Sequence, residues 1–71
     1  MTRLHFKKEL YVGEAVDEAI VAFDSHAKLS RSESESEWLV EVQAEQDEDL
    51  IADELANYAL GLSIELRGGP N

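Results

Sequence analysis

The sequence WLVEVQAEQDEDLIADELANYAL, residues 38–60, changes its hydrophobic period in the middle. Trp38, Val40 and Val42 alternate with other side chains, as a strand that is buried on one face requires. From Ile51 onward, the apolar side chains recur instead at the spacing of one helix face. They are Ile51, Leu55, Tyr58, Ala59 and Leu62. The segment therefore predicts a strand followed by an amphipathic helix.

An acidic corner, Asp47-Glu48-Asp49, separates the two periods. The first turn of a helix has unpaired amides and a partial positive charge, both of which favour nearby carboxylates. We therefore expect Asp47 to cap the second helix, with Glu48 and Asp49 in its first turn. An EF-hand calcium loop would need a further ligand and a glycine where this chain has Ile51 and Ala52. The corner is thus interpreted as a helix start and not as a metal site.

The first half of the chain has a similar rhythm of strand and helix. Residues 2–8 alternate as a first strand, and residues 12–23 have an apolar face at helical spacing. A weaker strand pattern covers residues 27–32. The polar run at residues 32–37, SESESE, is typical of a hairpin loop.

The segment after Leu60 fits two structures. Gly61 is a suitable helix stop, after which residues 62–66 alternate as a final strand. Alternatively, Gly61 lies inside a longer helix at a cost of about 1 kcal/mol, and Leu62 and Leu66 extend its apolar face. We favour the strand. The domain is expected to span residues 1–67, with a flexible tail at residues 68–71.

The element order is therefore β-α-β-β-α, with a final β. It predicts an α+β fold, a small two-layer sandwich with the ferredoxin-like split βαβ arrangement. The alternative is a three-stranded antiparallel meander with two helices, the second of them longer.

Length and charge restrict the classes of function. A chain of 71 residues buries only about 60 per cent of its unfolded surface, which leaves no room for a deep catalytic cavity and makes a homodimer a reasonable source of stability. The formal net charge is −10. Residues 1–31 are balanced, whereas residues 32–71 have eleven carboxylates against Arg67 alone. This charge argues against nucleic-acid binding and against anionic membrane surfaces.

Catalytic and metal-binding motifs are not recognisable in the sequence. The two histidines, His5 and His26, lie far apart on different predicted elements, and there is no cysteine. Neither a P-loop nor a GxGxxG motif occurs. We expect a non-enzyme without cofactor or metal. Because no signal-peptide pattern and no apolar run of membrane length occur, we expect it in the cytoplasm.

Three apolar side chains lie outside the predicted core faces, and one of them is Val21, opposite Val16 on the first predicted helix. Leu39 is on the polar side of its strand, and Leu60 is nearly opposite the apolar face of its helix. If Leu39 and Leu60 were neighbours, they would form a docking patch for a protein or peptide partner.

The order of sequence blocks resembles the HxsD family of the His-Xaa-Ser system, accessory proteins found with radical-SAM peptide maturases. The similarity lies in Tyr11, Ala15, Val16, Ala19 and Phe23, then in residues 38–42, WLVEV, and then in residues 54–60, ELANYAL. The resemblance implies a non-catalytic helper that binds a maturase or its peptide substrate, and it adds Asn57 to Leu39 and Leu60 as candidate partner-binding residues. The alternatives are a generic acidic domain adapted to high salt and a small enzyme or ligand binder.

Overall fold

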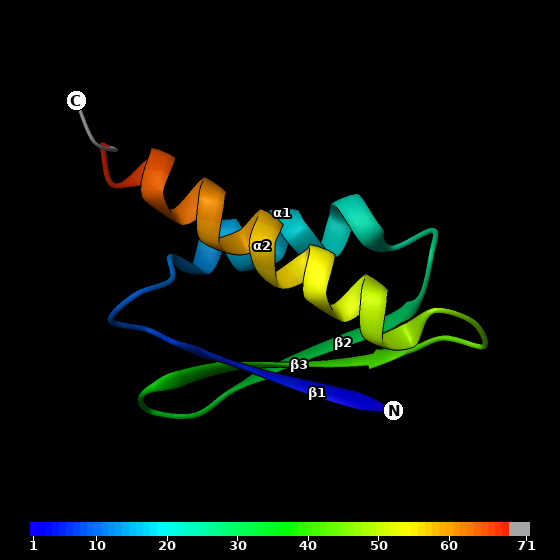
Figure 1. The fold of residues 1–71 in the computed structure, drawn as a ribbon. Helices are drawn as coiled ribbons and strands as arrows, with labels where there is room; N and C mark the ends of the chain where they lie inside the picture. Colours follow the sequence, from blue (N-terminus) through cyan, green and yellow to red (C-terminus); the bar gives the residue numbers. More distant parts are fainter. Residues whose placement is uncertain (69–71) are drawn as a thin grey trace.

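The computed structural model of the chain describes residues 1–68, which form two layers (Figure 1). One layer is a three-stranded sheet and the other is a pair of helices. In chain order the elements are β1 (Thr2–Lys7), α1 (Gly13–Phe23), β2 (Lys28–Glu33), β3 (Glu37–Gln43) and α2 (Glu48–Leu66). The predicted α+β class and the order β-α-β-β-α are confirmed. The tail predicted at residues 68–71 falls, except for Gly68, outside the described residues.

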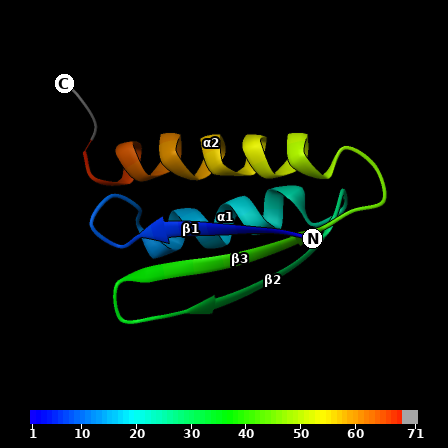
Figure 2. The ribbon, with the colours of Figure 1, turned by 60° about the horizontal axis from the view of Figure 1, so that its bottom comes forward.

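The sheet has the strand order β1-β3-β2, with both neighbouring pairs antiparallel (Figure 2). The register places Phe6 opposite Trp38 in the first pair and Leu29 opposite Val42 in the second. Since β3 runs against both neighbours, β1 and β2 are parallel to each other, and α1 connects them across one face. This is the split βαβ arrangement. The hairpin between β2 and β3 is shorter than predicted, because the strands continue to Glu33 and restart at Glu37.

The final strand predicted at residues 62–66 is wrong, because α2 continues through Gly61 to Leu66. Alternation of Leu62, Ile64 and Leu66 is the pattern that suggested a strand. In the helix, Leu62 is half-buried, whereas Ile64 and Leu66 are exposed near its end. The alternative description, a three-stranded sheet with a longer second helix, therefore fits.

The core lies between the sheet and the helices. The strands contribute their even-numbered apolar side chains on β1 and β3, and the helices contribute mostly alanines with one or two larger residues each, as the two periodicities require. The buried cluster consists of Phe6, Val16, Ala19, Val40, Val42, Ala52, Leu55 and Ala59. Small side chains on α2 let this helix lie close to the strands below it.

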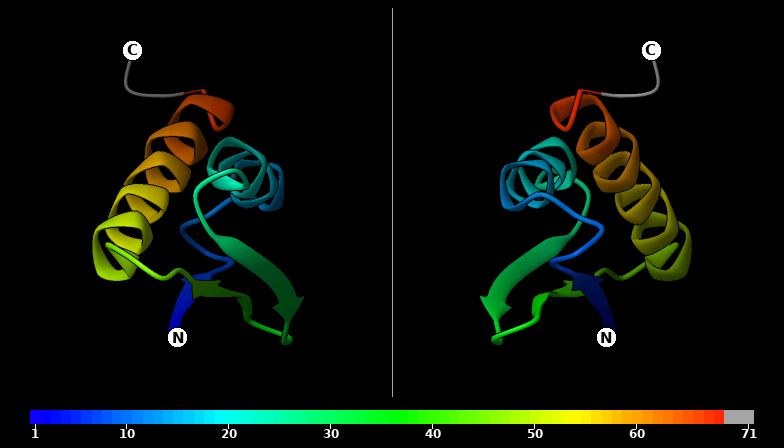
Figure 3. Two further views of the ribbon diagram at one scale, coloured as in Figure 1. Left: turned by 90° about the vertical axis from the view of Figure 1, so that its right-hand side faces the viewer. Right: turned by 90° about the vertical axis from the view of Figure 1, so that its left-hand side faces the viewer.

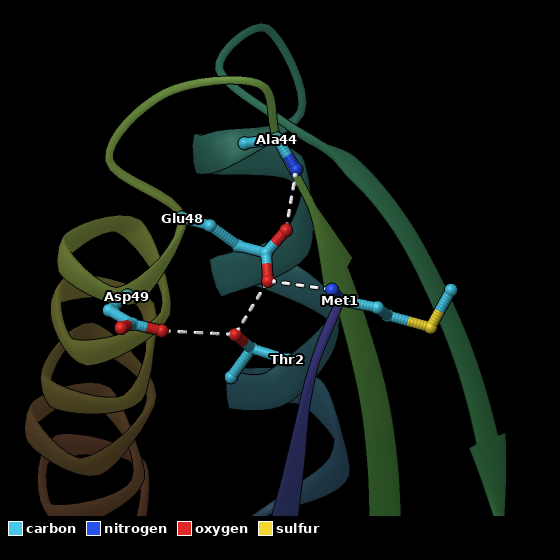
Figure 4. A network of polar contacts seen from close by, with 5 residues as sticks. All are labelled: Met1, Thr2, Ala44, Glu48 and Asp49. Atoms are coloured by element: carbon cyan, nitrogen blue, oxygen red, sulfur yellow. Dashed lines mark hydrogen bonds and ion pairs between the residues drawn. The ribbon is translucent and has the colours of Figure 1, made fainter.

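Asp47 does not cap α2 as predicted. Its backbone is in the left-handed region, with φ of 57°, and its side chain makes no capping hydrogen bond. Aspartate tolerates this conformation better than most residues do. The neighbouring Glu48 has taken over the role of anchor: its carboxylate accepts a hydrogen bond from the backbone N–H of Ala44 at 3.1 Å (Figure 4). Acidic residues do occupy the first turn, as predicted.

Candidate functional site

The most distinctive feature of the fold is the outer edge of β1. α2 lies over the β1 side of the sheet, and α1 lies over the β2 side (Figure 3). Within residues 1–68, no strand pairs with the outer side of β1. A fourth strand at this place would complete the four-stranded sheet predicted from the sequence, but the residues expected to form it belong to α2.

Hydrogen-bond directions show which backbone groups are free at this edge. Lys8 N donates to Ser36 O at 2.9 Å, so the even-numbered residues of β1 direct their backbone groups toward β3. The backbone groups of Arg3, His5 and Lys7 therefore point outward. The carbonyl of Lys7 already accepts hydrogen bonds from the following turn. No group within residues 1–68 pairs with the N–H and C=O groups of Arg3 and His5 or with the N–H of Lys7, so another chain can bind there.

The opposite edge, on β2, is protected by charged side chains. Ser34 N donates to Glu37 O at 2.9 Å, so Arg31 and Glu33 are among the residues whose backbone groups point outward from β2. Their side chains lie on the helix side of the sheet, where Arg31 Nε pairs with Asp17 Oδ1 at 2.8 Å and Glu33 pairs with Lys8 at 2.6 Å. Charged side chains on the helix side of an edge strand disfavour the addition of another strand. On β1, the side chains on the helix side of the sheet are instead those of Thr2, Leu4 and Phe6.

A row of basic side chains follows β1 on the face of the sheet that no helix covers, here called the open face. Arg3 Nη2 lies 2.7 Å from Glu41 Oε2, and His5 Nδ1 lies 3.4 Å from Glu37 Oε1. Lys7 is also opposite Glu37 in the register. The hydrogen bond from Arg3 is the main reason why the pKa of the Glu41 carboxyl lies below its usual value. The row thus recognises acidic side chains on a neighbouring strand.

The flank of α2 above this edge is partly apolar. Asp49 Oδ1 lies 3.2 Å from the Thr2 hydroxyl, which fixes the side of α2 that is turned toward β1 (Figure 4). Leu60 lies eleven residues after Asp49, close to three turns of about 3.6 residues, so it lies on the same side. Leu60 is 40% exposed, and Ala56, one turn earlier, is half-buried. Ala56 and Leu60 therefore give the later part of this flank an apolar character, while Asp49 and Asp53 lie on the same side nearer the start of α2.

The three predicted partner-binding residues do not form one patch. Leu39 is half-buried on the open face, opposite His5, whereas Leu60 lies in the helix layer. The sheet separates the two side chains. Asn57 is exposed on α2, three residues before Leu60 and turned further toward solvent. Sequence reasoning missed the edge of β1, although the alternation of Arg3, His5 and Lys7 was a usable signal.

A second cluster of basic and aromatic side chains stabilises the fold. Lys8 Nζ lies 4.5 Å from the ring centroid of Trp38, and the Arg31 guanidinium lies 5.2 Å from it. The indole N–H of Trp38 donates to the Tyr11 carbonyl at 3.3 Å. Because Glu33 and Asp17 pair with the two cations, this cluster has little charge left for a ligand.

A shallow open hollow lies between the α1–β2 and β3–α2 connections. Its lining includes Asp24, His26, Lys28, Asp47 and Ile51. Among residues 1–68, no group of three His, Cys, Asp or Glu side chains is placed to hold a metal ion. The hollow therefore offers neither a preformed metal site nor an enclosed cavity.

Comparisons of the chain with protein-family models, with curated proteins and with solved structures give no match. Within the described part of the chain, neither helix combines the length and the apolar character needed to cross a membrane.

Proposed function

We propose that this protein is a non-catalytic adaptor that binds a partner protein or peptide by strand addition at the outer edge of β1. The observation that supports the proposal most directly is the set of free backbone groups of Arg3, His5 and Lys7, beside a flank of α2 that has exposed apolar surface. Extended peptides commonly bind at such edges, where main-chain hydrogen bonds provide affinity and alternate side chains provide specificity.

The resemblance to HxsD-like accessory proteins supplies a class of partner. The resemblance implies that this partner is either a radical-SAM peptide maturase or its peptide substrate. Either could contribute the added strand, and neither role requires this chain to perform chemistry.

Site-specific photo-crosslinking in the native host tests the proposal. A photoreactive amino acid at Lys7 lies at the proposed edge, and the matched control is the same amino acid at Ser30, which lies on the open face at the opposite edge strand. We expect a crosslinked partner from position 7 that is not captured from position 30. Mass spectrometry of that product identifies the partner.

The crosslink must also depend on the edge. His5→Pro removes an outward N–H and should abolish the crosslink from position 7. An unchanged crosslink in this variant, or equal capture from both positions, contradicts the adaptor proposal. A product that depends on the edge but contains neither a maturase nor a peptide substrate rejects only the link to peptide maturation.

A further inference from the structure

We infer that the outer edge of β1 selects an extended segment in which acidic and apolar side chains alternate, with the acidic ones on the open face. The inference rests on the proposed function and gives the chemical class of the partner. It follows from three features of the edge: the pairing of β1 with β3, the flank of α2 above the edge, and the charges of β1 itself.

The inner neighbour of β1 shows the chemistry that this strand accepts. β3 places Glu37 and Glu41 on the open face, opposite Lys7 and Arg3. It places Trp38 and Val40 on the helix side, opposite Phe6 and Leu4. Directly opposed side chains in antiparallel strands lie about 4.5–5.5 Å apart at Cβ, so pairs of opposite charge stabilise the register. A strand on the outer side of β1 meets the same row, in which Arg3 and His5 already have partners on β3 and Lys7 has no ion pair among residues 1–68.

The helix side of the added strand meets apolar surface in the part of the flank beyond Asp49 and Asp53. Leu4 is only half-buried, and Leu60 is 40% exposed on the flank of α2 above the edge. Side chains that point from an added strand toward the helix layer would cover both residues. Apolar side chains are favoured at these alternate positions because burial of apolar surface contributes about 25 cal/mol per Å².

The same charges disfavour a second copy of this chain. In an antiparallel pair of β1 strands centred on His5, Arg3 of each copy faces Lys7 of the other. Like charges directly opposite each other are destabilising. The edge therefore selects a partner strand of different composition.

The acidic net charge of the protein does not prevent this recognition. The excess of carboxylates lies in residues 32–71, whereas residues 1–31 are balanced. At an ionic strength of about 0.15 M, charges more than about 8 Å apart in solvent are largely screened. Directly opposed side chains on paired strands are closer than that, so acidic side chains of a partner act mainly on Lys7, which has no ion pair among residues 1–68, and on Arg3, which Glu41 already pairs on the β3 side.

Capped synthetic octapeptides test the inference. The probe alternates glutamate and valine, the first control has the same residues with the glutamates in one block, and the second control alternates lysine and valine. We expect the probe to bind at least about tenfold more tightly than either control, as measured by fluorescence anisotropy. In the complex, NMR amide exchange should slow at Arg3, His5 and Lys7.

A proline substitution locates the binding at the edge. The N–H of His5 points away from β3, so His5→Pro should preserve the sheet, as edge strands allow, and reduce the affinity for the probe at least about tenfold. The matched control His5→Val keeps the N–H but lacks the imidazole, so it should weaken binding clearly less than His5→Pro does. If His5→Pro does not fold, slowed exchange at Arg3 and Lys7 in the unmodified protein still decides whether the peptide pairs with β1.

The outcomes separate the two proposals. Equal affinity for the alternating and blocked peptides overturns the inference, as does stronger binding of the lysine peptide. Lysine-peptide binding that is lost in His5→Pro leaves the adaptor function intact. The inference is also overturned if none of the peptides binds. In that case, the photo-crosslinking experiment still tests the adaptor function. Dimerisation through β1 that His5→Pro abolishes would show that a second copy occupies the edge, and this would overturn the inference.

Discussion

Ser63 joins two segments that are far apart in the sequence. Its side chain is fully buried in α2, and its Oγ accepts a hydrogen bond from the backbone N–H of Val12 at 3.0 Å. Val12 directly precedes the first turn of α1, so this bond fixes the start of one helix against the end of the other. A serine in an otherwise apolar helix face thus has a structural role at this position.

Ser63→Ala should destabilise the protein. The alanine keeps the small volume but leaves the N–H of Val12 without its partner. An unpaired polar group of this kind costs about 1–3 kcal/mol. Urea denaturation measures the difference, and Ser32→Ala on the exposed β2 strand is the control. A loss no larger than that of the control would show that solvent replaces the hydroxyl.

Gly61 is a helical residue without a structural need for glycine. A Cβ atom built at Gly61 meets no atom within 4 Å, and the residue is exposed inside α2. This differs from Gly13, where a Cβ atom would lie 2.9 Å from the ring of Trp38. Gly61 therefore lowers the stability of α2, whereas Gly13 makes room for the ring of Trp38.

Gly61→Ala should stabilise the protein. Alanine is favoured over glycine in a helix interior by about 1 kcal/mol, because glycine loses more backbone entropy. Thermal unfolding followed by circular dichroism measures the gain, and Gly13→Ala, expected to have the opposite sign, is the control. A destabilising effect of Gly61→Ala would indicate that α2 does not continue through this position in solution.

At the scale of elements, the sequence predicts four of the five elements from hydrophobic period alone, and also the start of α2. The end of α2 could not be predicted in the same way. Leu62, Ile64 and Leu66 alternate as a strand does, and Gly61 precedes them. The helix is stabilised there by the bond between Ser63 and Val12, which are 51 residues apart. No local pattern contains that contact.

The start of α2 is anchored by Glu48. Its Oε1 lies 2.8 Å from the Thr2 hydroxyl and 3.0 Å from the Met1 ammonium, and its Oε2 accepts the Ala44 N–H (Figure 4). The hydrogen bond from Thr2, followed by that from Ala44, lowers the pKa of the Glu48 carboxyl below its usual value. These contacts tie α2 to the start of β1 and to the residue that follows β3.

This pKa predicts a dependence of stability on pH. A carboxyl whose pKa is lower in the folded state stabilises the protein above its unfolded pKa of about 4.3, and the contribution is lost as the pH falls through the folded pKa. Glu48→Gln should therefore reduce stability at neutral pH and flatten its decline below about pH 5. Urea midpoints across the pH range measure this. Glu54→Gln removes the same charge but keeps the anchor contacts, so an equal effect from both variants would contradict the prediction.

At the scale of the whole molecule, the candidate site could be predicted only in part. Exposure of Leu60 follows from its place on the helical wheel. Whether Leu39 and Leu60 are neighbours could not be predicted, because it depends on which face of the sheet the helices cover. The free edge of β1 depends on strand order, which long-range pairing between β1 and β3 determines. Such pairing has no local signal in a single sequence.

The distribution of charge over the whole chain leads to a last prediction. The eleven carboxylates of residues 32–71, which have Arg67 as the one basic residue in that segment, repel one another in the folded state. Raising the KCl concentration from about 0.05 to about 1 M shortens the screening length to about 3 Å. The midpoint of thermal unfolding should therefore rise by several degrees. Salt also weakens the attraction between Arg3 and Glu41, but exposed ion pairs contribute little stability.

Differential scanning calorimetry measures this response. Chloride is preferable to sulfate, which strengthens apolar burial independently of charge. A variant with Asp53→Asn and Glu54→Gln, two exposed acidic residues of α2, should gain less from salt than the unmodified protein. A flat response in both proteins would mean that the acidic side chains are spaced widely enough not to strain the fold. Adaptation of a generic acidic domain to high salt would then lose its physical basis, while recognition of a strand at β1 would be unaffected.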